Sequence, residues 1–248
     1  MEPIRNILER IKNWDRQSTE KEILREQSKS RAAQDFGFGP EPGLISYIAE
    51  LTQRQEAGEA AYNIKSLLWQ LAGIDRGQRH TFDTWKVDSK YPILKKVRDS
   101  VMDWASFKSQ KPFLTLAGPP GTGKTHLAIA ATQLIVDAGA TVMYRRSASL
   151  LDEVRAATLA GKKDHIFSDL RASSFLILDD LGAEKFSDWS LAALDEIVDL
   201  RYSMRRHLMV CTNQKSEDLP PRIADRLADK AIAEVIQLAV PSYRRGRG

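Results

Sequence analysis

The stretch Leu116–His126, LAGPPGTGKTH, decides the fold of this chain. Its segment from Gly118 to Thr125 matches the pattern G-x-x-x-x-G-K-[ST]. The apolar run FLTLA precedes this segment and THLAIAATQLI follows it, so the loop would join a strand to a helix. Glycines in such a loop let backbone N–H groups curl around phosphates, and the helix N-terminus adds partial positive charge. The stretch therefore predicts a phosphate-binding loop.

Two side chains in this loop carry specific chemistry. We expect Lys124 to place its charge on the β- and γ-phosphates of ATP, and the hydroxyl of Thr125 to ligate Mg²⁺. The residues that we expect to hold ATP are Gly118, Pro119, Pro120, Gly121, Thr122, Gly123, Lys124, Thr125 and His126.

Short apolar runs alternate with helical patterns from about residue 70 onward, which is typical of a parallel α/β sheet. Each run is almost continuously apolar, as expected of a strand that is covered on both faces. The expected strands are Phe113–Ala117, Thr141–Arg145, Phe175–Asp179, Leu208–Thr212 and Glu234–Leu238, and the expected helices lie near Thr125–Ala138, Ser149–Leu159 and Leu191–Tyr202.

A pair of adjacent carboxylates ends one of these runs, in FLILDDLG at Phe175–Gly182. The carboxyl edge of an open α/β sheet is where ligands bind. We expect Asp179 to hold Mg²⁺ through its water shell and Asp180 to orient or deprotonate the attacking water. A second acid after the metal-binding one favours water as the nucleophile, and so an NTPase over a small-molecule kinase.

Two further signals follow along the chain. The run LMVCTNQ predicts a strand that ends in a polar residue, Asn213, which would lie beside the γ-phosphate and position the water. In PPRIADRLAD, Arg222 and Arg226 are four residues apart on one helical face. They are either plain surface charges or an arginine finger for the ATP of a neighbouring subunit.

Composition sets the limits on class and compartment. The chain has 248 residues, of which 42% are hydrophobic and 28% are charged, as in a globular protein. No apolar run approaches the ~18 residues of a membrane span, and the N-terminus lacks the apolar core of a signal peptide. Cys211 is the single cysteine, and the four histidines are scattered without ligand spacing, so a zinc cluster is implausible. We expect a cytoplasmic protein with no membrane partner.

The formal net charge of +4 is unevenly distributed. The first 60 residues hold nine Lys/Arg and eleven Asp/Glu, so the positive excess lies in the remainder. Clusters at Arg145–Arg146, Arg201–Arg206 and in the tail YRRGRG suggest a polyanion partner. The alternative is that these clusters are an ordinary solvated basic surface.

The N-terminal part differs from the rest in pattern. An apolar stripe on a predicted helix precedes a highly polar segment, so it either packs on the protein's own core or docks a partner helix. The breaker-rich stretch Asp35–Gly43 predicts a linker, and further helices are indicated around residues 44–51 and 64–71. The stripe consists of Ile4, Ile7, Leu8, Ile11 and Trp14.

The motifs GPPGTGKTHLA, LILDDLGAEK, DLRY, CTN and RIADRL, in this order, resemble those of the AAA+ ATPases of the DnaC/DnaI helicase-loader group and the related IstB transposition helpers. The lead-in Ala72–Trp85 and the SYR of Ser242–Arg244 also look like this group, and the resemblance covers about residues 70–248. Ten residues follow the last expected strand, so the resemblance implies a family branch without a C-terminal lid.

The resemblance implies an AAA+ P-loop NTPase with a three-layer α/β/α parallel sheet, preceded by a small helical N-terminal region. Residues 1–69 would bind the partner and residues 70–248 would form the ATPase domain. Asn213 would take the sensor role and Arg222 that of the finger, with ATP held between subunits.

The function so implied is that of an ATP-dependent helicase loader in DNA replication. The N-terminal region would bind a replicative DnaB-type helicase, and the ATPase domain would bind single-stranded DNA and self-associate. Two alternatives stay open. One is an IstB-like helper that acts with a transposase, and the other is an ATP-binding DNA switch with negligible hydrolysis.

Overall fold

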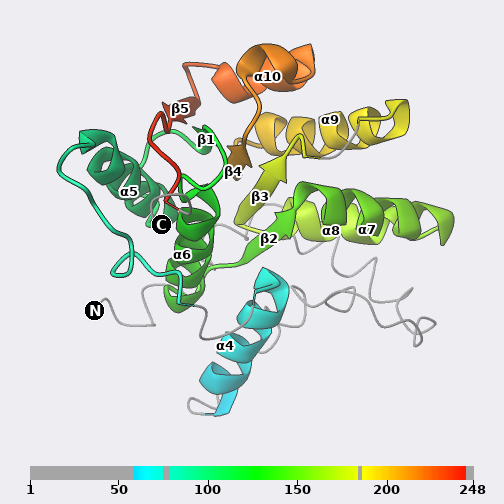
Figure 1. Cartoon of the computed structure of the whole chain (residues 1–248). Helices are drawn as coiled ribbons and strands as arrows, with labels where there is room; N and C mark the ends of the chain where they lie inside the picture. Colours follow the sequence, from blue (N-terminus) through cyan, green and yellow to red (C-terminus); the bar gives the residue numbers. More distant parts are fainter. Residues whose placement is uncertain (1–58, 75–78, 184–185, 244–248) are drawn as a thin grey trace.

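The computed structural model describes residues 59–74, 79–183 and 186–243. Its centre is one parallel sheet of five strands in the order β2-β3-β4-β1-β5 (Figure 1). Because neighbouring strands run parallel, each connection must cross over the sheet, and helices form these crossovers. The strands are β1 (Phe113–Ala117), β2 (Val142–Arg146), β3 (Phe175–Leu181), β4 (His207–Thr212) and β5 (Ala233–Gln237).

Helices cover both faces of this sheet, which gives three layers (Figure 1). One face carries α6 with α5 and α4 packed beside it, and the other carries α7, α9 and α10 with α8 against α7 and α9. The helices are α4 (Glu59–Ala72), α5 (Pro92–Ala105), α6 (Lys124–Asp137), α7 (Ser147–Leu159), α8 (Lys163–Ala172), α9 (Asp188–Ser203) and α10 (Pro221–Ala228), with a 3₁₀ turn at Ser216–Asp218.

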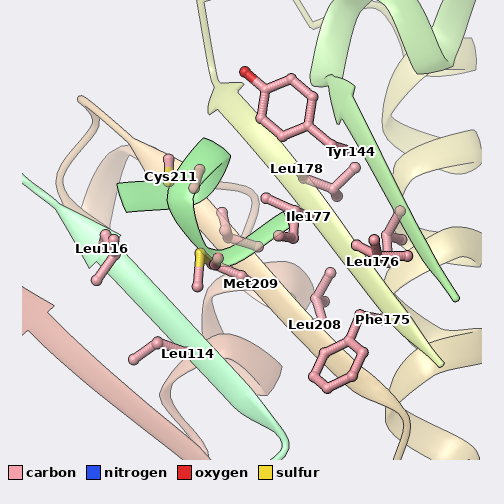
Figure 2. Packing of buried hydrophobic residues seen from close by; sticks show 14 of the residues in the cluster. Leu114, Leu116, Tyr144, Phe175, Leu176, Ile177, Leu178, Leu208, Met209 and Cys211 are labelled. Atoms are coloured by element: carbon pink, nitrogen blue, oxygen red, sulfur yellow. The ribbon is translucent and has the colours of Figure 1, made fainter. Parts of the chain in front are cut away.

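The core explains why these residues form strands. All five residues of β1 are buried, and the apolar residues of β3 and β4 are buried on both faces, because helices lie above and below them. Figure 2 shows this apolar cluster, which reaches from Phe175 at one end of the sheet to Cys211 and Tyr144 near the other. Cys211 in β4 is buried.

The expected strands and the three expected helices are confirmed to within three residues at their ends. The largest difference for a strand is at the predicted end of β3. The strand continues past Asp179 to Leu181, and its register against β4 is irregular between Leu178 and Leu181. Asp180 adopts φ 60° there, in the left-handed region, so the two consecutive carboxylates break the strict alternation of a strand.

Two helices in the described region were not predicted. In α5, the buried residues Leu94, Val97, Val101 and Trp104 follow helical spacing, so the signal was present in the sequence. In α8, ten residues long, only Phe167 and Leu170 are buried, which is too weak a pattern to identify a helix.

The N-terminal stripe from Ile4 to Trp14 and the linker at Asp35–Gly43 lie outside the described residues. The helical pattern around residues 64–71 is confirmed as part of α4, where Leu68 and Leu71 are buried against the α6 side of the sheet. The domain boundary between residues 69 and 70 stays a prediction, and it falls within this helix. None of the described helices is long and apolar enough to cross a membrane.

Candidate phosphate-loop site

The loop between β1 and α6 is shaped by glycines that no other residue could replace without strain. Gly121 has φ +82°, and a Cβ there would collide with the Ser242 side chain. Gly123 has φ +98°, and a Cβ there would collide with the ring of Trp85. Since L-residues rarely adopt such φ values, the sequence of this loop determines its backbone path.

The first turn of α6 lies at the end of this loop. Gly123 is its N-cap residue and supplies no side-chain oxygen, so no side chain caps the first N–H groups of the helix. Amides in that position, together with the positive end of the helix dipole, favour an anion. The glycine pattern predicted a loop between a strand and a helix, and this is confirmed, while phosphate binding by the loop stays a prediction.

The Lys124 side chain folds back across the loop. Its Nζ donates to the carbonyl oxygens of Gly118 and Pro119 at 2.7 and 2.9 Å, and the residue is buried. Burial lowers the pKa of the Lys124 ammonium, while Cys211, Asp179 and Asp180 raise it. The cation therefore lies within the loop, bound to groups that a stronger anionic acceptor can replace.

The carboxylate of Asp179 lies next to the loop and is 2% exposed. Its Oδ1 accepts from the Thr125 hydroxyl at 3.2 Å and from the N–H of Asp180 at 3.1 Å. Its Oδ2 accepts from the hydroxyl of Tyr144 at 2.8 Å. A hydroxyl and a carboxylate in contact are oxygen ligands of the kind that Mg²⁺ prefers, so this pair fits the metal.

Asp180 and Asn213 meet on the exposed side of the same edge. The Nδ2 of Asn213 donates to Oδ1 of Asp180 at 3.0 Å, although Asn213 follows β4 and Asp180 lies in the adjacent strand β3. The sequence placed each at the end of a strand but did not pair them. The parallel register of β3 and β4 brings them together.

Residues upstream of β1 also reach the loop. Trp85 covers Gly123, and its indole N–H donates to the carbonyl oxygen of Leu94 at 3.1 Å. His126, in the first turn of α6, lies with Nε2 2.8 Å from the carbonyl oxygen of Thr81. Burial lowers the pKa of the His126 imidazole. The lead-in resemblance pointed to this segment, but not to these contacts.

The segment after β5 closes the loop from the other side. The N–H of Tyr243 donates to the carbonyl oxygen of Gly121 at 2.9 Å, and Lys86 lies over the Tyr243 ring at 5.9 Å. No helix follows β5 within the described residues, which end at Tyr243. Sequence reasoning missed this contact because it links parts of the chain that are about 120 residues apart.

Arg222 and Arg226 lie on α10, beside α9. The Arg222 side chain is 74% exposed and its Nη1 is 3.1 Å from Oδ2 of Asp195. The Arg226 side chain is 14% exposed and is paired with both Asp195 and Asp199. Of these two arginines, Arg222 is the one with its side chain largely in solvent. Its role as a finger stays a prediction.

Two members of the basic clusters do not belong to a surface, so that part of the polyanion interpretation was wrong. Arg145 is buried, and its guanidinium contacts Glu153 and the carbonyl oxygen of Tyr144. Arg201 is fully buried and donates to backbone carbonyls. Both are structural cations, while Arg146 at the end of β2 is exposed. No cluster of metal-ligating His, Cys, Asp or Glu occurs among the described residues.

The family of IstB-like ATP-binding proteins matches residues 93–245, and the chain belongs to this family. A putative insertion sequence ATP-binding protein of Sinorhizobium fredii is 29% identical over 83% of this chain and 69% of its own length. The replicative helicase loader DnaC of Escherichia coli is 24% identical over 62% of this chain, which spans 63% of that relative. The fold is that of the AAA+ P-loop ATPases: the crystal structure of the DnaC helicase loader superposes with a TM-score of 0.59 at 22% identity, over 66% of this chain and 99% of the other.

Proposed function

We propose that this IstB-like family member is an Mg²⁺-dependent ATPase that loads a replicative helicase onto single-stranded DNA. One observation supports the ATPase part of this proposal most: the hydroxyl of Thr125 and the carboxylate of Asp179 meet beside a glycine loop that encloses the Lys124 ammonium. This arrangement suits a nucleoside triphosphate with its Mg²⁺ ion.

Each residue has a distinct part in the proposed reaction. The loop from Gly118 to His126 and the first amides of α6 bind the phosphates, and Lys124 turns from its loop carbonyls to the β- and γ-oxygens. Thr125 and Asp179 would hold Mg²⁺, which would supply positive charge against the phosphates of the nucleotide. The water oxygen bonds to the γ-phosphorus while the bond from that phosphorus to the β-phosphate oxygen breaks and ADP leaves. Asp180 takes the proton of this water, and Asn213 keeps the Asp180 carboxylate and the water in line.

The wider assignment rests on the family and its relatives. Residues 70–248 form the ATPase domain that self-associates and binds single-stranded DNA, and residues 1–69 bind the helicase. The second candidate is an ATPase helper of a transposase, since the insertion sequence relative matches over 83% of the chain. The two candidates share the ATPase chemistry and differ in the partner protein.

The chemistry is tested with Asp180→Asn. We expect ATP to bind as in the wild type and turnover to fall by roughly 10²- to 10⁴-fold, because a general base is lost while the phosphate contacts remain. Asp218→Asn, at an exposed carboxylate in the 3₁₀ turn, is the matched control and should hydrolyse ATP normally. Equal turnover in Asp180→Asn and the wild type would refute the role of Asp180, and negligible turnover in the wild type itself would favour a binding switch.

The shared active site is tested by mixing two inactive proteins. Arg222→Ala should bind ATP and hydrolyse it poorly, since an arginine finger contributes on the order of 10³ or more to turnover. Lys124→Ala binds ATP weakly but keeps its own Arg222. Mixed with single-stranded DNA, the two should recover part of the activity. No recovery with co-assembly confirmed would remove Arg222 from the proposal.

The partner is tested with the full-length chain. Purified replicative helicase and purified transposase are offered separately to the wild type and to the double variant Ile7→Asp/Ile11→Asp. Binding of the helicase by the wild type and not by the variant supports the loader. Binding of the transposase alone would make the chain a transposition helper with the same ATPase site.

A further inference from the structure

Tyr144 is a residue of the site that neither the motifs nor the proposed chemistry uses. Tyr144 lies in β2, opposite Ile177 of β3. Ile177 is two residues before Asp179 on the same strand. Side chains two apart on a strand share a face, so Tyr144 can reach Asp179 diagonally across the sheet. Figure 2 shows its ring beside the end of β3, with the hydroxyl directed away from the apolar cluster.

The hydrogen bonds of Asp179 divide its two oxygens between two functions. Oδ1 accepts from the Thr125 hydroxyl, which is thereby turned so that its lone pairs face away from the carboxylate. Oδ2 accepts from the phenol of Tyr144 at 2.8 Å, in a setting where both residues are buried. With a donor on each oxygen, the carboxylate has little freedom to rotate about its Cβ–Cγ bond.

We propose that Tyr144 is a positioning residue for the metal site: its hydroxyl fixes the Asp179 carboxylate so that Asp179 and Thr125 present their oxygens to Mg²⁺ together. The inference rests on the proposed function, because it concerns the same metal and nucleotide. Groups that hydrogen-bond to metal-holding carboxylates set both the orientation and the affinity of such sites.

The chain contains a matched control. Tyr202 in α9 donates its hydroxyl to Oδ2 of Asp229 at 2.7 Å, the same bond between the same residue types. That pair lies between the end of α9 and the turn before β5, at the opposite end of the sheet from the phosphate loop. Tyr202→Phe removes one Tyr–Asp hydrogen bond just as Tyr144→Phe does, but leaves the metal site intact.

The experiment measures binding rather than turnover. Wild type, Tyr144→Phe and Tyr202→Phe are titrated as full-length proteins with a fluorescent ATP analogue, once in excess Mg²⁺ and once in EDTA. The dissociation constant in EDTA divided by the dissociation constant in Mg²⁺ reports how much the metal strengthens nucleotide binding. We expect this ratio to fall about tenfold in Tyr144→Phe, with the affinity in EDTA unchanged, and to stay at the wild-type value in Tyr202→Phe.

The other outcomes each overturn a definite statement. A wild-type ratio in Tyr144→Phe, or an equal loss of affinity with and without Mg²⁺, would reduce Tyr144 to a packing residue. A larger ratio in Tyr144→Phe would mean that the phenol competes with the metal for Asp179. If the wild type binds the ATP analogue equally well with and without Mg²⁺, the proposed function is overturned, which is a separate result.

Discussion

The two ends of the parallel sheet bury charged side chains in opposite ways. At the carboxyl end of the strands, the Lys124 ammonium donates to loop carbonyl oxygens. The Asp179 carboxylate accepts from the hydroxyls of Thr125 and Tyr144. At the amino end, Arg201 donates to four backbone carbonyl oxygens, those of Leu170, Ser173, Ser174 and His207, at 2.6–3.0 Å.

The difference lies in what a ligand can displace. The carbonyls around Arg201 belong to the end of α8, the connection from α8 into β3 and the first residue of β4, and exchanging them would require unfolding these segments. The carbonyls under Lys124 belong to a loop whose neighbouring amides have no side-chain cap. A buried charge therefore marks a binding site where its partners can be exchanged, and a structural anchor where they cannot.

The largest expected effect is at the anchor. Arg201→Met leaves four carbonyls without their donor, so we expect the free energy of unfolding to fall by about 3–5 kcal/mol, measured by urea denaturation. Arg171→Met, at an exposed arginine in the last turn of α8, should change it by less than about 0.5 kcal/mol. Equal losses in the two variants would contradict the anchor role.

The second effect is at the exchangeable end. Lys124→Ala should unfold like the wild type and lose roughly 10- to 100-fold in ATP affinity, because a charged hydrogen bond to phosphate disappears. Lys215→Ala, at an exposed lysine paired with Glu217, should bind ATP normally. Calorimetry and urea denaturation separate the two readouts. A large loss of stability with unchanged affinity would make Lys124 a second anchor.

The third effect is on pH dependence at the amino end. His207 packs against the rings of Trp104, Phe107 and Phe175, and burial, followed by Arg201 and Arg206, lowers its pKa to about 4. An unfolded histidine titrates near ~6.5, so between these values the unfolded chain binds the extra proton. The stability is therefore complete above pH ~6.5 and falls as the pH drops toward 4.

We expect a loss of roughly 2 kcal/mol from this one group between pH 7 and pH 5. His207→Phe keeps an aromatic ring and removes the titration, so its unfolding free energy should lack that part of the pH dependence. The difference between the two urea denaturation series isolates His207 from the carboxylates. Identical pH profiles for the wild type and His207→Phe would disprove it.

The smallest effect concerns a buried polar atom that is neither anchored nor exchangeable. The Thr115 hydroxyl in β1 is buried without a hydrogen-bond partner in the described part of the chain. Thr115→Val removes this unsatisfied oxygen at nearly constant volume, so we expect a gain of up to about 1 kcal/mol in the free energy of unfolding. Thr132→Val, whose hydroxyl donates to the carbonyl oxygen of Ala128 at 2.9 Å, should lose stability instead.

The sequence by itself determined the sheet and the phosphate loop. Strand and helix periods, the glycine pattern and the carboxylates after an apolar run are local signals, because backbone conformation depends on neighbouring residues. For that reason the segments around Gly118–Thr125 and the Asp179–Asp180 pair were located correctly before any packing was known. The catalytic roles of these residues stay predictions.

Only the tertiary structure decided which partner each polar side chain has. Arg145 and Arg201, which the sequence suggested as surface charges, are buried in the structure. Asp179 accepts a hydrogen bond from the phenol of Tyr144, 35 residues upstream. Neither result has a local signal, since burial and hydrogen bonding depend on which distant segments the strand order brings together. An arginine on a strand or helix looks the same in the sequence whether it faces water or a ring of carbonyls.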